Sequence, residues 1–343
     1  MEEKRSPRRL WLLLVAILAG LVMLGGTYTA LAGPPPSASP GEQLSAGPSA
    51  VAWSSGWVAL AQGETRTFTH ALGLDPDQYA VELWFLDTDD GWGINRRWYG
   101  GVDFNGQELG AAWKELTSNT IQVVRSANDR AADKVRVMVW VPAARPSSDS
   151  GWVGINQAQN ITFTFDLGVA VDDLAVSLWF SGTNGIHHIA YGSKSVAGSW
   201  IGANWHHLTN TSVQVVRRAA DLFVDQVRVQ VTYPETPTYD STWVDINPGQ
   251  ALTLAHGLNW PPELLVARGE CKKDPGPGIH QMFSGGNHSS VMLSNGWQGA
   301  NLQNVTSNTI TIFRWFDDTV CPQGRVRIWE RAYAQAIPIV TNE

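Results

Sequence analysis

The sequence predicts an all-β protein, with three tandem antiparallel β-sandwich domains after an N-terminal signal or anchor helix. Three observations predict this fold. A stretch of about 95 residues occurs three times, which is longer than a solenoid unit. Each copy contains short runs of β-branched and aromatic residues, separated by Gly, Asn, Asp and Pro. Beyond the N-terminus, no segment shows a sustained helical period with capping residues.

The repeats are clearest in their second halves, which read GAAWKELTSNTIQVVR, GANWHHLTNTSVQVVR and GANLQNVTSNTITIFR. These segments begin at Gly110, Gly202 and Gly299, which are 92 and 97 residues apart. A repeat of this length can hold its own hydrophobic core, so we expect each copy to fold as a separate domain. Each copy also has a tryptophan near its start, at Trp57, Trp152 and Trp243.

The repeats divide the chain into six parts. In the first copy, the alternating pattern predicts strands at Thr65–Thr69, Tyr79–Leu86, Thr120–Arg125 and Lys134–Val141. The parts are a signal peptide or membrane anchor (1–32), a tether rich in Pro, Ser and Gly (33–52), three β-sandwich repeats (53–144, 148–235 and 240–333) and a C-terminal tail (334–343).

The N-terminal segment has the features of an export signal. Basic side chains lie within residues 4–9, the uncharged apolar run 10–24 follows, and Ala30 and Ala32 are small residues that a signal peptidase reads. The apolar run can also be extended to about 23 residues, long enough for an uncleaved membrane anchor. Both alternatives place the repeats outside the cytoplasm, either secreted or on the cell surface.

Composition and charge narrow the function classes. Hydrophobic residues make up 43% and charged residues 16%, a globular composition. The formal net charge is −7, so we do not expect a basic patch that binds nucleic acid. The 17 tryptophans must serve either as core or as contact surface.

The two cysteines, Cys271 and Cys321, lie in the third repeat. In an oxidising compartment we expect them to pair, closing a loop that is worth roughly 4 kcal/mol in the chain-entropy model. Two free thiols are the alternative. A zinc site is disfavoured because no CxxC motif or nearby histidine completes one.

One loop of the first repeat is the main candidate for ligand binding. It combines acidic and amide side chains with large aromatic ones, which a strand core explains poorly. Aromatic rings can stack on the apolar face of a pyranose while Asp, Asn and Arg bind its hydroxyls. The alternative is a loop cluster that covers one end of the sandwich. The candidate residues are Asp87, Asp89, Trp92, Asn95, Arg97, Trp98 and Tyr99.

Two groups of side chains suggest metals. Asp87, Asp89 and Asp90 alternate with glycines as in a calcium loop, although the spacing is not that of an EF-hand and a solvated turn is the alternative. Calcium is the one cofactor that the sequence suggests. Repeat 2 carries His187-His188 and His206-His207. Adjacent histidines on a strand point to opposite faces, so one from each pair could bind zinc, and surface histidines are the alternative.

An Arg–Asp motif follows the same strand in every copy. We interpret it as a structural pair that holds a loop, and a polar rim for sugar hydroxyls is the alternative. Trp113 and Trp205 precede this strand and are expected to be packing residues. The pairs are Arg125 with Asp129, Arg217 with Asp221, and Arg314 with Asp317.

Several motifs resemble those of H-type lectin modules. They are GW near the repeat start, the strands TFTHALG and TLAHGL, and PPELLVA at 261–267. The resemblance covers about half of each repeat. It implies a six-stranded antiparallel sandwich that trimerises and binds N-acetylgalactosamine. The GAxW–LT segment lies outside the family's motifs, so no binding residue is carried over.

These features predict an extracellular, non-catalytic binding protein that recognises a glycan or another surface protein, as in adhesion. We expect membrane contact only through the N-terminal segment, and homo-oligomers fit this class. The sequence contains no nucleophile elbow, HExxH, P-loop or GxGxxG motif. The alternatives are a structural spacer or assembly unit of a cell-surface layer, and a glycoside hydrolase with a carboxylate pair formed in space.

Overall fold

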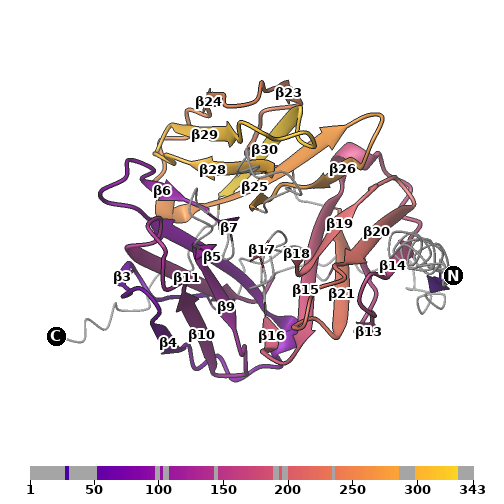
Figure 1. The fold of residues 1–343 in the computed structure, drawn as a ribbon, viewed down its shortest axis with the longest axis horizontal. Helices are drawn as coiled ribbons and strands as arrows, with labels where there is room; N and C mark the ends of the chain where they lie inside the picture. Colours follow the sequence, from indigo (N-terminus) through magenta and orange to yellow (C-terminus); the bar gives the residue numbers. More distant parts are fainter. Residues whose placement is uncertain are drawn as a thin grey trace, which may run out of the picture.

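Six β-sheets form a ring around a central axis, as the blades of a six-bladed β-propeller (Figure 1). The structure is a computed structural model that describes residues 28–30, 52–96, 101–102, 108–142, 146–187, 193–194, 200–233, 236–285 and 298–330. Helical structure within these residues is limited to three short 3-10 turns, η2 (Pro76–Gln78), η3 (Val171–Asp173) and η4 (Pro262–Leu264).

Each repeat contributes one wide and one narrow blade. The strands of repeat 1 are β2 (Ala52–Ser54), β3 (Val58–Ala59), β4 (Thr65–Thr69), β5 (Ala80–Leu86), β6 (Ile94–Asn95), β7 (Gly101–Val102), β8 (Glu108–Leu109), β9 (Ala111–Lys114), β10 (Thr120–Arg125) and β11 (Lys134–Trp140). Those of repeat 2 are β12 (Ser148–Asp149), β13 (Val153–Gly154), β14 (Asn160–Thr164), β15 (Ala175–Gly182), β16 (Gly185–His187), β17 (Ser193–Lys194), β18 (Trp200–Ile201), β19 (Ala203–His206), β20 (Ser212–Arg217) and β21 (Gln226–Thr232). Those of repeat 3 are β22 (Tyr239–Asp240), β23 (Val244–Asp245), β24 (Ala251–Ala255), β25 (Leu265–Lys273), β26 (Gly278–Gln281), β27 (Ser284–Gly285), β28 (Gln298–Gln303), β29 (Thr309–Arg314) and β30 (Gln323–Glu330).

The blades have the same strand order in every repeat. The wide blades are β2–β11–β5–β6, β12–β21–β15–β16 and β22–β30–β25–β26, with β3, β13 and β23 on the long strand. The narrow blades are β4–β10–β9, β14–β20–β19 and β24–β29–β28–β27. The described strands pair antiparallel, except that β1 (Tyr28–Ala30) lies parallel to β14. Because the chain crosses between the two blades of a repeat several times, those blades cannot separate.

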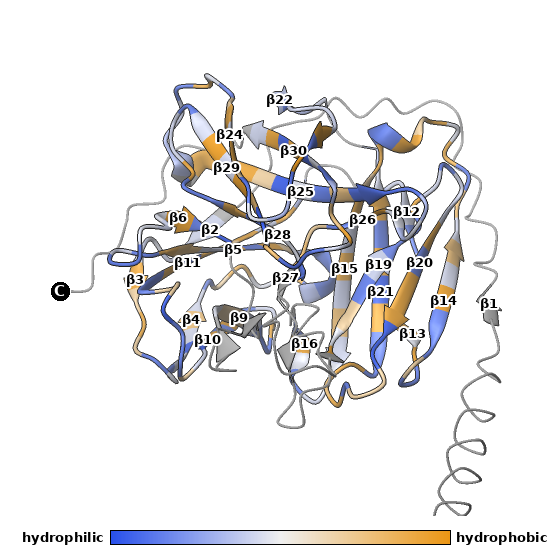
Figure 2. Cartoon of the chain, turned by 45° about the horizontal axis from the view of Figure 1, so that its top comes forward, coloured by the Kyte–Doolittle hydropathy of each residue, from blue (hydrophilic) through white to orange (hydrophobic). Residues whose placement is uncertain are grey.

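Burial along the strands explains the two kinds of blade. In β10 and β20 every second residue is buried, as the alternating sequence predicts for a strand with one face on a core. In β11 every residue after Lys134 is buried. The long strand β11 therefore packs on both faces, against its own repeat and against a neighbouring one, whereas in β21 only every second residue is fully buried. Figure 2 shows the mixture of apolar and polar residues along these strands.

The hydrophobic cores link the repeats in a cycle. Each core lies between the two blades of one repeat and also receives residues from a second repeat. Trp179 of repeat 2 joins the core of repeat 1, and Ile279 of repeat 3 joins that of repeat 2. Trp84 and Trp140 of repeat 1 join the core of repeat 3, which completes the cycle.

Backbone hydrogen bonds also cross each boundary. The short strands β6, β16 and β26 extend toward the narrow blade of the neighbouring repeat. The amide that follows a narrow-blade strand donates to a carbonyl of that short strand, from Leu116 to Ile186, from Leu208 to Ile279 and from Val305 to Ile94, each with an N–O distance of 3.1 Å. These bonds satisfy strand edges that separate domains would expose to water.

The expectation of three separate β-sandwich domains is wrong, because the repeats form one closed propeller. The second face of the long strand in each wide blade contacts another repeat, through Trp140, Arg228 and Arg327. The predicted N-terminal helix lies outside the described residues, which begin at β1. Within the part of the chain that the structure describes, no helix is both long and apolar enough to cross a membrane.

Candidate functional site

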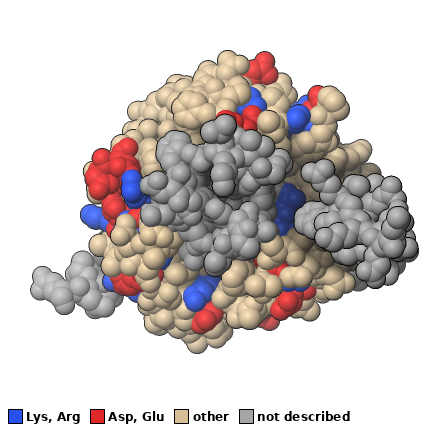
Figure 3. Space-filling model, in the orientation of Figure 1, with Lys and Arg blue, Asp and Glu red and all other residues tan. Residues whose placement is uncertain are grey.

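The candidate site is a cavity of about 160 Å³ on the axis of the ring. Its wall contains residues from β5, β15 and β25 of the wide blades and from β9, β19 and β28 of the narrow blades. All three repeats therefore contribute to one site. Figure 3, in the orientation of Figure 1, shows acidic and basic side chains of the described residues in small groups on this face of the molecule.

One side of the cavity is aromatic. Trp113 and Trp179 meet edge to face at the boundary between repeats 1 and 2, with ring centroids 5.5 Å apart. Trp140 and Trp205 also line the cavity. Trp113 and Trp205 are the packing residues expected from the sequence, and they are buried as well as cavity-lining. The equivalent position in repeat 3 is Leu302, so the aromatic wall is uneven around the axis.

The charged side chains of the wall are engaged by other groups. Glu82 forms an ion pair with Arg96, whose guanidinium lies 4.8 Å from the centre of the Trp84 ring. Glu270 forms an ion pair with Arg327 at the boundary between repeats 3 and 2. Burial raises the pKa of Glu270, and the charge of Arg327 opposes that rise. The paired charges give the cavity no excess of either sign from these residues.

Two uncharged oxygens of the wall lack hydrogen-bond partners. The side-chain oxygens of Asn301 and Gln281 are buried without a partner among the described residues. Both residues line the cavity, and Asn301 is only 1% exposed. Amide oxygens accept hydrogen bonds, and buried acceptors are rarely left unsatisfied. A hydroxyl or N–H donor in the cavity would satisfy them.

The acidic loop predicted as the ligand site is held together by its own backbone. The buried carboxylate of Asp87 accepts hydrogen bonds from the amides of Asp89, Asp90 and Trp92, at 3.2, 3.0 and 2.6 Å. Asp87 therefore shapes the turn and has little capacity left for a ligand. Three other candidates, Arg97, Trp98 and Tyr99, lie outside the described residues.

Asn95 belongs to a structural position shared by all repeats. Its side chain donates to the carbonyl of Ala131 at 3.2 Å, and the equivalent His187 and His280 bond the carbonyls of Phe223 and Val320 at 3.1 and 2.9 Å. The repeated motifs GIN, GIH and GIH at these positions are the feature of the sequence that indicates a shared structural role. The residue that follows this position, Arg96 in repeat 1 and Gln281 in repeat 3, is the one that lines the cavity.

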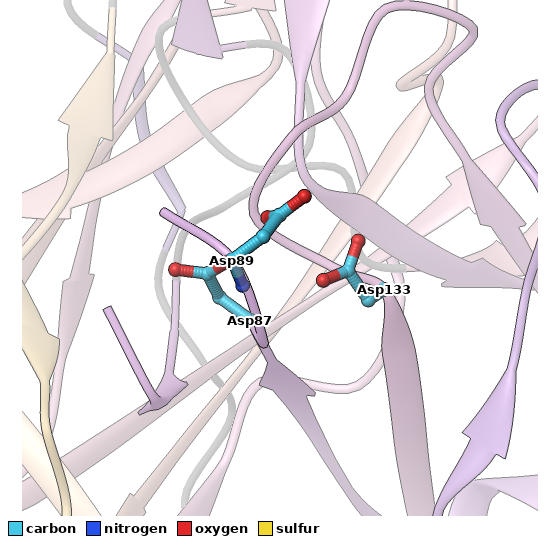
Figure 4. A group of neighbouring side chains, drawn as sticks. All are labelled: Asp87, Asp89 and Asp133. Carbon is cyan, nitrogen blue, oxygen red and sulfur yellow. The ribbon is translucent and has the colours of Figure 1, made fainter. Parts of the chain in front are cut away.

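The predicted calcium ligands are partly brought together (Figure 4). Asp87, Asp89 and Asp133 each offer a carboxylate oxygen within 4.8 Å of the others, so Asp133 takes the place predicted for Asp90. Asp133 already accepts hydrogen bonds from the amide and hydroxyl of Thr88, at 2.9 and 2.7 Å. Repulsion by Asp133 and burial raise the pKa of Asp89. Calcium needs six to eight oxygens, and much of this group is already engaged.

The Arg–Asp pairs lie behind the cavity wall and hold a buried loop. Arg125 and Asp129 are paired at 2.8 Å, and Arg217 and Asp221 at 2.9 Å. In repeat 3 the prediction of Asp317 is wrong, because Arg314 pairs with Asp318 at 2.7 Å. Each aspartate also accepts a hydrogen bond from the glycine that begins GAxW or GANL, namely Gly110, Gly202 and Gly299.

The predicted zinc site between two histidine pairs is not formed by the described residues. His187 is buried and bonded to a backbone carbonyl, and His188 lies outside the described residues. The expectation that adjacent histidines point to opposite faces is wrong for His206 and His207. His207 has φ of 50°, which brings the two Nδ1 atoms to 2.5 Å.

The predicted disulfide between Cys271 and Cys321 is confirmed, with a Cα–Cα distance of 5.0 Å. It joins β25 to the loop before β30. The matching position to Cys271 is Phe85 in repeat 1 and Phe180 in repeat 2, where apolar packing takes its place.

No family model, no curated protein and no solved structure matches this chain. The class of protein is therefore defined by its own geometry, as a three-repeat, six-bladed β-propeller with one cavity on its axis. The resemblance to H-type lectins stays a prediction.

Proposed function

We propose that this chain is an extracellular, non-catalytic binding protein that holds one neutral sugar ring in the axial cavity. One observation supports this most. The aromatic pair Trp113 and Trp179 lines the same cavity as Asn301 and Gln281, whose side-chain oxygens have no partner among the described residues. A pyranose has an apolar face for the indole rings and hydroxyls for the acceptors.

The charges favour a neutral ligand. Glu82 and Glu270 are already paired with Arg96 and Arg327, and Arg268 lies over the ring of Trp329 at 5.8 Å. A carboxylated or phosphorylated sugar would compete with Glu82 or Glu270 for the paired guanidinium groups, and breaking such a pair is costly for a buried charge. A neutral sugar leaves them in place.

The size favours a single ring. At about 160 Å³ the cavity is smaller than the roughly 300–1,000 Å³ of pockets for drug-sized ligands. It suits a free monosaccharide or the terminal residue of a glycan. In this proposal the three repeats form one binding site together and do not carry one site each.

The disulfide supports the extracellular location. Such bonds persist in oxidising compartments and are rare in the cytosol. The basic and apolar N-terminal sequence supports the same location. A surface protein that carries such a terminal sugar would be the partner of this site in adhesion.

The test is a calorimetric titration of the full-length chain with a panel of free monosaccharides, neutral, N-acetylated and acidic, with and without calcium. A glycan array follows. We expect a neutral or N-acetylated sugar to bind and acidic ones not to bind. Trp113→Leu, which copies the residue of repeat 3, should weaken binding about tenfold, because an aromatic contact is worth up to roughly 1.5 kcal/mol beyond its area.

Trp152→Phe is the matched control. Trp152 donates to Asp77 at 3.1 Å across a repeat boundary and does not line the cavity. It should bind the sugar as the wild type does. Absence of binding to every sugar tested would contradict the proposal and would favour the alternative of a structural unit of a cell-surface layer.

A further inference from the structure

The end of β19 carries two histidines whose ring nitrogens converge. The Nδ1 atoms of His206 and His207 lie 2.5 Å apart, and the ring centroids are 4.7 Å apart. His207 is exposed and His206 is half-buried. In the absence of another atom between them, one ring must donate its proton to the other.

A backbone feature common to the repeats causes this convergence. The residue after each narrow-blade strand has a left-handed backbone, with φ of 49° at Glu115, 50° at His207 and 49° at Asn304. Side chains of successive strand residues normally point to opposite faces, and this conformation interrupts the alternation. Only repeat 2 has histidines at both positions, where the others have Lys114-Glu115 and Gln303-Asn304.

The neighbouring repeat fixes the second histidine. The amide of His207 donates to the carbonyl of Pro277 at 2.9 Å, and Gly278 packs against its Cα, where an added Cβ would be in van der Waals contact at 3.6 Å. The nearby His280 has both ring nitrogens bonded to carbonyls, those of Gln281 and Val320. Among the described residues, His206 and His207 are therefore the imidazoles with Nδ1 atoms turned toward each other.

The separation of the nitrogens selects among metals. With metal–imidazole bonds of roughly 2.0 Å, a right-angled chelate places its nitrogens about 2.9 Å apart and a tetrahedral one about 3.3 Å apart. The observed contact of 2.5 Å is shorter than both, so the rings must part to admit an ion, and the right-angled arrangement needs the smaller opening. Square-planar geometry with imidazole ligands is typical of Cu²⁺, which also binds more tightly than the other divalent first-row metals.

We propose that His206 and His207 chelate one Cu²⁺ ion through their Nδ1 atoms, with water at the remaining positions. The two side chains open by a few tenths of an ångström to admit the ion, which replaces the proton shared between the rings. This site is separate from the axial cavity, which neither histidine lines.

The test uses the full-length chain without a histidine tag, titrated with Cu²⁺ in the presence of glycine as a weak competitor. We expect one Cu²⁺ per chain, with an axial electron paramagnetic resonance spectrum split by two nitrogens. His206→Gln combined with His207→Asn should abolish this binding. The pair copies Gln303-Asn304, and Asn304 adopts the required backbone with φ of 49°, so the fold is retained.

Lys114→Gln combined with Glu115→Asn makes the same two residues at the equivalent position of repeat 1 and is the matched control. Cu²⁺ binding should be unchanged in it. Binding that persists in the His206→Gln/His207→Asn variant would overturn the proposal, as would an absence of Cu²⁺ binding by the wild type or a spectrum without nitrogen splitting. A Zn²⁺ titration should show weaker binding, and equal or tighter Zn²⁺ binding would contradict the right-angled geometry.

Discussion

Comparison of equivalent residues separates structural positions from divergent ones. Asp129, Asp221 and Asp318 are identical because each accepts the same buried backbone and arginine bonds. The residues that line the cavity differ between repeats. At one equivalent position of β5, β15 and β25 they are Glu82, Ser177 and Arg268. The scaffold has threefold repetition, whereas the chemistry of the cavity does not.

His187 should make stability depend on pH. Burial lowers the pKa of His187 to about 4, below the value of about 6.5 expected in the unfolded chain. The unfolded state then binds a proton that the folded state does not, so stability is full above pH 6.5 and falls between pH 6.5 and 4. This histidine alone should cost about 2 kcal/mol between pH 6.5 and 5.

The measurement is the free energy of unfolding in urea at pH 7.5 and pH 5. His187→Asn copies Asn95 of repeat 1 and should reduce the loss of stability between the two pH values. His206, whose pKa burial also lowers to about 4, should keep part of the loss. An unchanged pH dependence in the variant would show that His187 is not the titrating group.

At the scale of residues, the sequence predicted the structural Arg–Asp pairs better than it predicted the role of the candidate ligand-binding residues. The repeated Arg–Asp spacing is local, so it identified the buried pairs, although one partner was misplaced by a residue at Asp317. Asn95 was assigned to ligand binding because its carbonyl partner, Ala131, is 36 residues away. The sequence of one repeat does not reveal a contact between residues so far apart. The structural role of Asn95 is indicated only when the repeats are aligned and Asn95 is compared with His187.

At the scale of elements, the strands were the most predictable feature. β4 and β10 coincide with the predicted Thr65–Thr69 and Thr120–Arg125, because their alternation reflects one buried face. The packing of β11 could not be predicted. Its second buried face contacts another repeat, and a fully buried strand has the same composition whichever partner covers it.

Polar clamps hold the wide blades to the neighbouring repeat. Arg228 bonds Asp149 of its own repeat at 2.9 Å and the carbonyl of Asp77 in repeat 1 at 3.1 Å. Burial acts to raise the pKa of Asp149, but the hydrogen bonds from Arg228, Gly151 and Gln230 and the charge of Arg228 together outweigh it and lower that pKa. Asp149→Ser, which copies Ser54, should lower the free energy of unfolding by about 1–2 kcal/mol at pH 7.

The pH dependence of this loss distinguishes the clamp from a general defect. A carboxylate with a lowered pKa stabilises the fold above its unfolded pKa of about 3.9 and loses that effect as the pH falls through the folded value. The difference between Asp149→Ser and wild type should therefore shrink in strong acid. Asp166→Ser changes an exposed aspartate and serves as control. Equal losses in both variants would refute the clamp.

Reduction of the disulfide should destabilise the propeller. Cys271 and Cys321 are 50 residues apart, for which the chain-entropy model gives about 4 kcal/mol. The check is urea unfolding with and without dithiothreitol. The chain has two cysteines, so reductant acts on this bond alone, and a variant with both changed to serine should not respond to it. Equal stability of oxidised and reduced protein would be inconsistent with this estimate.

At the scale of the whole molecule, the repeats stabilise one another. The core of repeat 3 contains Trp84 and Trp140 from repeat 1, although the two repeats are furthest apart in the chain. Sequence repetition predicted three independent domains, and the resemblance to H-type lectins implies a trimer of separate modules. In this protein the three units close within one chain, which a self-comparison of the sequence cannot detect.

Unfolding should therefore be a single cooperative event. Loss of any repeat would expose the indole rings that it covers and unpair the strand edges at two boundaries. Thermal denaturation followed by calorimetry should give one transition for the full-length chain. Three resolved transitions would indicate independent domains and would contradict the closed ring.

The central claim is that the three repeats share one ligand site on their axis. The most direct test is the stoichiometry of sugar binding, measured by native mass spectrometry together with calorimetry on the full-length chain. The axial cavity predicts one sugar per chain, with binding weakened in Trp113→Leu. Three sugars per chain would place the sites on the individual repeats and would contradict this claim.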